Sequence, residues 1–151
     1  MAVDARRSRT ALAPNRTVLY GVLTLAALSV IGANISVASD LSATFLDAMG
    51  PKGRLSIPLP MTVAQIAMAV AAGSSRRIVA MIGSGFVAAA LFAGVISGFF
   101  DGGYADERLT TFERVYQVSF IAALTVVGAI AAMRFLEAMR AASPSRDHER
   151  P

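Results

Sequence analysis

Few side chains in this sequence are suited to chemistry, and three of the most suggestive ones carry amides. Asn34, Gln65 and Gln117 stand inside long uncharged stretches. At about 1.5 Å per helical residue, each lies within roughly 5–12 Å of the same side of the predicted bundle. An amide both donates and accepts hydrogen bonds, so the three could line a small polar cavity for a solute or a lipid head group. The alternative, which we favour, is that they hydrogen-bond between helices and hold the bundle together.

The remaining polar residues argue against catalysis and coupled transport. The single histidine, His148, stands near the C-terminal end and the sequence has no Cys, so a haem, zinc or di-iron site in the apolar stretches lacks ligands. A Ser or Thr nucleophile needs a neighbouring base. Ion or proton coupling uses a charge inside the membrane, whereas Asp40, Asp101 and Glu113 border the uncharged stretches. We expect a protein that is not an enzyme and has no cofactor or metal.

Four stretches without Asp, Glu, Lys or Arg must position these residues. They cover residues 17–39, 55–75, 78–100 and 115–133, with lengths of 23, 21, 23 and 19 residues. A helix needs roughly 20 apolar residues to cross a hydrocarbon core about 30 Å thick. A helix bundle in water would show polar stripes, which these stretches lack. The sequence therefore predicts an all-α integral membrane protein, a four-helix transmembrane bundle in the lipid bilayer.

The predicted organisation is one helical domain, residues 17–137, between two polar ends. Residues 1–16 form a basic arm and residues 138–151 a charged tail, and we expect both to be disordered because neither has apolar residues enough to pack. The four spans are placed at about 17–39, 55–73, 78–100 and 113–135.

The basic residues predict the orientation of the chain. Ten of the fourteen Lys and Arg residues flank the side on which both termini lie. Basic residues in short loops stay in the cytoplasm, so both termini are expected there, with loops 40–54 and 101–114 outside. The residues that determine this topology are Arg6, Arg7, Arg9, Arg16, Arg76, Arg77, Arg134 and Arg140.

The same arginines indicate partners and a location. Near the cytoplasmic face each would attract anionic lipids, and because they do not share one folded face we expect no nucleic acid to bind. Arg outnumbers Lys by 13 to 1 and Ala is abundant, a bias that we associate with a high-GC bacterial genome. We therefore expect the inner (cytoplasmic) membrane of a bacterium.

The two outer loops differ in pattern. Between residues 41 and 49 apolar residues recur at helical spacing, before Gly50 and Pro51 end the pattern. This predicts either a short amphipathic helix or an ordinary loop whose apolar residues pack on the helix ends. The second loop leads into the fourth span, where Thr110 or Thr111 is expected to cap the helix, with Glu113 in its first turn.

Small residues are expected to hold the spans together, because helices in lipid associate by close approach rather than by the hydrophobic effect. This predicts a tight bundle without a wide pore. The pair Gly94 and Gly98 forms a GxxxG motif, which could mediate a homodimer or packing within the chain. We favour packing within the chain, because each helix has three possible partners there. The predicted packing residues are Ala26, Ser29 and Ala33 in the first span, Gly83, Ala90, Gly94 and Gly98 in the third, and Ser119, Ala122 and Ala129 in the fourth.

These observations predict a small non-enzymatic membrane protein that acts as an accessory, scaffold or partner-binding subunit of another membrane protein. The alternative is a transporter or binder of a small solute or lipid head group that uses the outer polar residues. A polar cavity inside the bundle would favour the alternative. A solid interior packed by Gly and Ala would favour the accessory role.

Overall fold

The computed structural model describes residues 15–51, 53–100, 104 and 106–141, and the regular structure within them is helical. Three helices are long and apolar enough to cross a membrane, with 22, 24 and 30 residues, and a fourth, α4, has 14. The prediction of an all-helical membrane protein with long apolar helices is confirmed at this level. The helices are α2 (Thr17–Ala38), α3 (Phe45–Ala48), α4 (Leu59–Ala72), α5 (Arg77–Phe100) and α6 (Thr111–Arg140).

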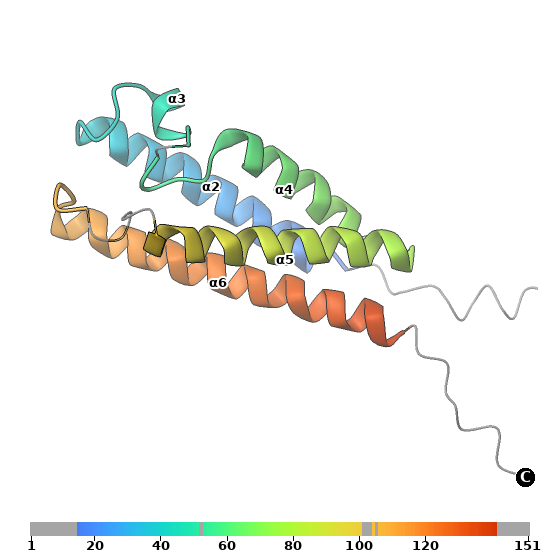
Figure 1. The fold of residues 1–151 in the computed structure, drawn as a ribbon. Helices are drawn as coiled ribbons and strands as arrows, with labels where there is room; N and C mark the ends of the chain where they lie inside the picture. The colour runs from blue at the N-terminus through green and yellow to red at the C-terminus, as the bar shows by residue number, and fades with distance from the viewer. Residues whose placement is uncertain (1–14, 52, 101–103, 105, 142–151) are drawn as a thin grey trace, which may run out of the picture.

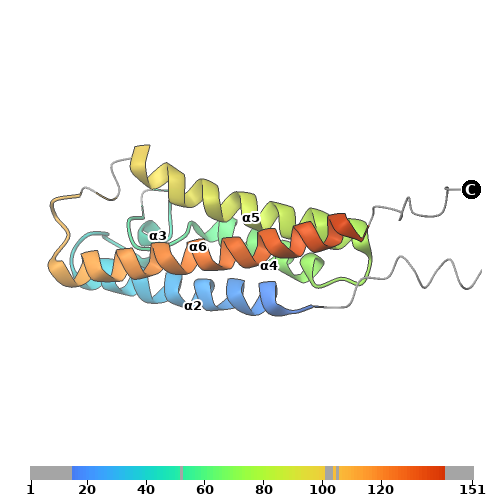
Figure 2. The same ribbon diagram turned by 90° about the horizontal axis from the view of Figure 1, so that it is seen from below.

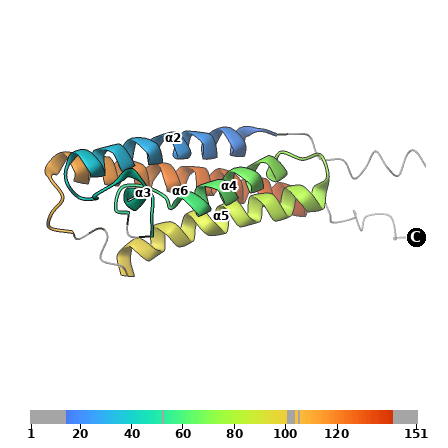
Figure 3. The ribbon, with the colours of Figure 1, turned by 90° about the horizontal axis from the view of Figure 1, so that it is seen from above.

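The four longer helices lie side by side as a bundle (Figure 1). The start of α2, the end of α6 and the α4–α5 connection lie on one side of the bundle, here called the termini side. The short helix α3 and the start of α6 lie on the other, the α3 side. Both α4 and α6 contact α2 and α5, so α2 and α5 lie diagonally opposite each other in the bundle. Figures 2 and 3 show that the C-terminal end of α5 diverges from α2 on the α3 side.

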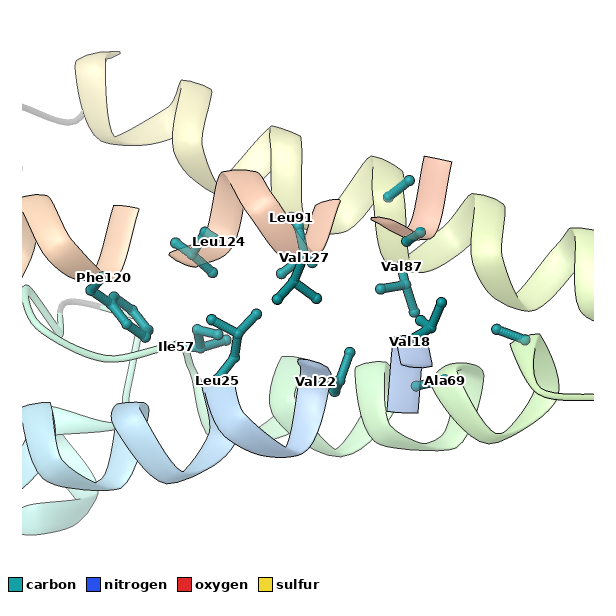
Figure 4. Close-up of a cluster of buried hydrophobic side chains, with 13 residues drawn as sticks. Val18, Val22, Leu25, Ile57, Ala69, Val87, Leu91, Phe120, Leu124 and Val127 are labelled. Atoms are coloured by element: carbon teal, nitrogen blue, oxygen red, sulfur yellow. The ribbon is translucent and has the colours of Figure 1, made fainter. Parts of the chain in front are cut away.

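Branched and aromatic side chains fill the centre of the bundle. Val22 and Leu25 of α2 meet Leu91 of α5 and Leu124 of α6 in one buried cluster (Figure 4). The outward faces are apolar as well: Phe100 is 85 % exposed and Val118 is 65 % exposed. A chain that is apolar both inside and outside requires apolar surroundings, which agrees with a membrane protein.

Local sequence signals explain two of the helix ends. Helix α6 begins with a capping box, in which Glu113 Oε2 accepts a hydrogen bond from Thr110 N at 2.6 Å and Thr110 Oγ1 accepts one from Glu113 N at 3.4 Å. The predicted cap is confirmed. Helix α2 ends at Ala38. Two residues later Asp40 has a φ of 57°, in the left-handed region, and Leu41 N donates back to Ser36 O at 2.9 Å. This is the arrangement of a Schellman motif.

The predicted amphipathic helix over residues 41–49 is reduced to the single turn of α3. Thr44 caps this turn by accepting a hydrogen bond from Asp47 N at 3.1 Å. Ala48 and Met49 are buried against Ala33 of α2, while Leu46 is 70 % exposed. The segment therefore combines both expectations, a helical turn and a loop that packs its apolar residues on a helix end.

The second predicted span differs most from the structure. We expected a helix from residue 55, but α4 begins at Leu59, and the preceding residues Leu55, Ser56 and Ile57 are buried without being helical. The reason is Pro58, because a proline disfavours the helical conformation of the residue before it. We call residues 54–58 the buried segment.

The buried segment lies directly against the backbone of α2. A Cβ atom on Gly32 would lie 1.8 Å from the carbonyl oxygen of Leu55, so only glycine fits there. The hydroxyl of Ser29 accepts a hydrogen bond from Ile57 N at 2.7 Å and donates one to Ile57 O at 3.4 Å. From the other side Gln117 Nε2 donates to Arg54 O at 3.4 Å. Irregular backbone inside an apolar region requires such partners.

Replacing Ser29 by alanine is expected to destabilise the fold. In Ser29→Ala the N–H of Ile57 loses its partner in the interior, which costs about 1–3 kcal/mol. We expect a clearly lower unfolding temperature for the purified full chain in detergent. The matched control is Ser119→Ala, because Ser119 is exposed and its hydroxyl donates only within its own helix, to Val115 O at 2.8 Å. Equal effects of the two substitutions would contradict this role of Ser29.

Candidate functional site

A cavity of about 1410 Å³ lies on the α3 side of the bundle, between α4, α5 and α6. The buried segment and the loop that carries α3 form a further wall. Most of its lining is apolar, as at Leu91, Phe120 and Leu124, with a few polar side chains among them. Pockets for small molecules have this character and volumes of roughly 300–1,000 Å³, so this one has room for a larger molecule.

The cavity opens on the surface of the bundle along α5. Ala93, Gly94 and Ser97 line it and are nevertheless exposed. A Cβ atom on Gly94 would meet no atom within 4 Å. The bundle was predicted to be tight throughout, and this end of α5 departs from that prediction because it diverges from its neighbours.

Within the described part of the chain, the two glycines of the GxxxG motif of α5 contact no other helix. Gly94 faces the cavity, whereas a Cβ atom on Gly98 would lie 2.3 Å from the ring of Tyr104. The Tyr104 hydroxyl donates to Val95 O at 2.7 Å, and its ring meets Phe99 edge to face with centroids 4.8 Å apart. Burial raises the pKa of Tyr104. Tyr104 thus forms part of the cavity lining beside Gly98.

The structure brings together two of the three predicted amides. Gln65 of α4 and Gln117 of α6 both line the cavity. Asn34 is exposed on α2, where its Nδ2 donates to Val30 O of the same helix at 2.7 Å. The shared depth of the three residues could be read from the sequence, but the direction in which Asn34 points could not.

The two glutamines differ in their partners. Gln117 is buried and donates to the backbone of the buried segment, at Arg54 O. Gln65 is only 2 % exposed, and within the described part of the chain no group hydrogen-bonds to its side chain. A buried amide without a partner costs about 1–3 kcal/mol. Because Gln65 lines the cavity, its amide group can hydrogen-bond a molecule that occupies this space.

A cluster of charged side chains lies at the rim of the cavity. Arg54 and Arg108 line the cavity and both pair with Asp106, at 3.5 Å from Arg54 Nε and at 2.9 Å from Arg108 Nη2. Hydrogen bonds from the side chain and then the backbone of Arg108 lower the pKa of Asp106 to about 2, and the charge of Arg54 adds to this. The cluster joins the two loops of the α3 side. Sequence reasoning missed it, because two loops of mixed charge do not indicate which residues meet.

The predicted topology arginines gather on the termini side. Arg134 is only 4 % exposed: its Nε donates to Ala72 O at the end of α4 at 3.4 Å, and its Nη1 pairs with Glu137 at 3.2 Å. Arg77 Nε donates to Ala138 O at 2.8 Å. A cation at a helix C-terminus is stabilising, so Arg134 and Arg77 also hold helix ends together. Arg16, Arg76 and Arg140 are exposed on the same side, and Arg6, Arg7 and Arg9 lie outside the described residues.

The small residues have unequal roles in packing. Gly83 packs closely on α4, since a Cβ atom there would lie 2.5 Å from Met68 O. Ser29 and Ala33 are fully buried, Ala26 is half-buried, and Ala90 lines the cavity. On α6 the expectation needs correction, because the helix packs through a different face, which combines larger residues such as Phe120 and Leu124 with the small residues Gly128 and Ala131. The predicted residues Ser119, Ala122 and Ala129 lie on its exposed face.

Two further observations concern chemistry and relatedness. Among the described residues no group of three or more His, Asp or Glu side chains is placed to hold a metal ion.

Comparison of the chain with protein-family models, with curated proteins and with solved structures finds no match.

The Asp106 cluster predicts a loss of stability in strong acid. Because the pKa of Asp106 falls from 3.8 to about 2 on folding, its ion pairs stabilise the fold fully above about pH 4 and are lost as the pH falls through about 2. Thermal unfolding followed by circular dichroism over this range should show the loss in the wild type and much less of it in Asp106→Asn. Glu107→Gln, which changes the exposed neighbour, is the control and should behave as the wild type. An unchanged profile in Asp106→Asn would contradict the assignment.

Proposed function

We propose that this chain crosses the cytoplasmic membrane of a bacterium four times, with both termini in the cytoplasm, and binds a lipid-like molecule without catalysing a reaction. The crossing number and orientation are supported by the termini side, where α2 starts, α6 ends and the arginines gather. The cavity then belongs to the outer half of the membrane.

The second crossing combines α4 with the buried segment. Helix α4 has 14 residues, or about 21 Å, which is less than the roughly 30 Å of a hydrocarbon core. The buried segment continues from its N-terminus toward the α3 side, held by Ser29 and Gln117. Non-helical backbone at membrane depth is tolerated where protein surrounds it, and Leu55 and Ile57 are buried.

The observation that carries the binding proposal is an apolar cavity open along an apolar helix. The open edge of the cavity is formed by Ala93 and Gly94 of α5. Neighbouring side chains of α5, such as Phe92 and Ile96, are exposed and apolar. In a bilayer these side chains contact lipid, so lipid molecules have direct access to the cavity. An apolar chain fits the lining formed by Leu91, Phe120 and Leu124, whereas water does not.

The accessory role stays a second candidate because of the exposed small residues on α6. Ser119, Ala122 and Ala129 form a stripe on which the helix of another membrane protein could approach closely. A stoichiometric second protein that co-purifies in mild detergent, and is lost in Ala122→Leu, would support this role.

Filling the cavity should reduce the amount of bound lipid. In Gly94→Leu the new side chain projects into the cavity and displaces about two methylene groups of the ligand, at about 0.8 kcal/mol each, which lowers the affinity on the order of tenfold. Lipid that stays bound through purification in detergent can be counted by native mass spectrometry. Ala122→Leu adds the same side chain on an exposed helix face and should retain lipid as the wild type does. Full retention in Gly94→Leu would contradict the proposed function.

A further inference from the structure

We propose, building on the proposed function, that the ligand is an uncharged lipid of the diacylglycerol type, which carries a free hydroxyl beside its ester-linked acyl chains. In this arrangement the hydroxyl and an ester carbonyl hydrogen-bond the amide of Gln65. The acyl chains lie against the apolar wall of the cavity.

The first support is that Gln65 offers the cavity an amide with no partner in the described part of the chain. Its side chain is 2 % exposed, lines the cavity and receives no hydrogen bond from these residues. The other buried polar side chains of the lining donate to backbone oxygens, Ser56 to Ala48 O and Gln117 to Arg54 O. Gln65 is therefore the side chain through which the buried part of the cavity can hydrogen-bond a ligand.

The second support is the apolar surroundings of this amide. Gln65 is the seventh residue of α4, about 9 Å along the helix from its N-terminus. The cavity wall includes Leu91 and Leu124, which belong to the buried cluster at the centre of the bundle. A charged group in such surroundings is costly unless an opposite charge meets it, and an amide carries no charge. The ligand group that binds Gln65 is therefore uncharged.

The third support is that the charges at the rim are matched within the protein. Arg54 and Arg108 both pair with Asp106, and Arg108 uses both its Nε and its Nη2 for this. Asp47, which also lines the cavity, adds a second carboxylate. Among the described residues of the rim two cations are thus balanced by two anions. This balance favours a charged head group of neither sign.

A diacylglycerol complements both polar atoms of the amide. The amide nitrogen of Gln65 donates hydrogen bonds and the amide oxygen accepts them. The glycerol hydroxyl can donate to the oxygen, and an ester carbonyl on the neighbouring glycerol carbon can accept from the nitrogen. A lipid with the same esters but an acetylated hydroxyl leaves the amide oxygen unpaired.

The experiment is a competition for the purified full chain among diacylglycerol, phosphatidylcholine and phosphatidylglycerol with identical acyl chains. Lipid that stays bound is extracted and counted by mass spectrometry. We expect the wild type to retain diacylglycerol in several-fold preference over either phospholipid and over acetylated diacylglycerol. Gln65→Leu should lose this preference, whereas Asn34→Leu, which replaces an exposed amide outside the cavity lining, should keep it.

A stability measurement separates ligand binding from a structural role of the amide. Because Gln65 has no partner among the described residues, Gln65→Leu should leave the unfolding temperature of the lipid-free chain unchanged or raise it. Added diacylglycerol should raise the unfolding temperature of the wild type more than that of Gln65→Leu. A lower unfolding temperature of lipid-free Gln65→Leu would show that the amide holds the fold, and would overturn the inference.

The remaining outcomes separate this inference from the proposed function. Equal retention of all lipids by the wild type, or a preference for a phospholipid, would overturn the uncharged ligand while the cavity remained a lipid site. An unchanged preference in Gln65→Leu would show that water satisfies the amide and would also overturn the inference. A wild type that retains none of the lipids, with Gly94→Leu unchanged, would overturn both proposals.

Discussion

The architecture depends on one constraint: backbone polar groups that enter the apolar interior without forming a helix must find partners there. Residues 54–58 do so against α2. The contact requires Gly32, where a side chain would collide with Leu55 O, and Ser29, which pairs with the backbone of Ile57. Gln117 supplies a further partner at Arg54 O. Three polar or small residues on two helices thus determine where the irregular segment lies.

The shape of the cavity follows from this arrangement. Because Pro58 ends the non-helical buried segment, helix α4 starts only at Leu59. Helix α5 contacts α4 and α6 but diverges beyond them on the α3 side. The space that results is lined by the buried segment itself, including Ile57. The Asp106 ion pairs with Arg54 and Arg108 tie the segment to the loop that follows α5. The cavity is therefore a consequence of the packing of one non-helical segment.

The sequence was sufficient for the features that depend on local patterns. The long uncharged stretches predicted the long helices, and the Thr110–Glu113 spacing predicted the cap that begins α6. It was not sufficient where the outcome depends on contacts between distant residues. An uncharged run containing Pro58 predicts the start of a helix. Nothing in the local sequence indicates that the Ser29 hydroxyl will accept a hydrogen bond from Ile57 N. Uniformly apolar helices also do not reveal which face packs. The small residues of α6 were therefore assigned to the wrong face, and Asn34 was expected to hydrogen-bond between helices although it is exposed and bonds within α2.

The most direct test of the buried segment is amide hydrogen exchange of the full chain in lipid nanodiscs, resolved at Ile57. We predict slow exchange at this amide, comparable with the interior of α2, because its N–H is bonded to Ser29 in a buried environment. The neighbouring loop around Pro51, which is exposed, should exchange fast. Fast exchange at Ile57, equal to that of the loop, would contradict the account.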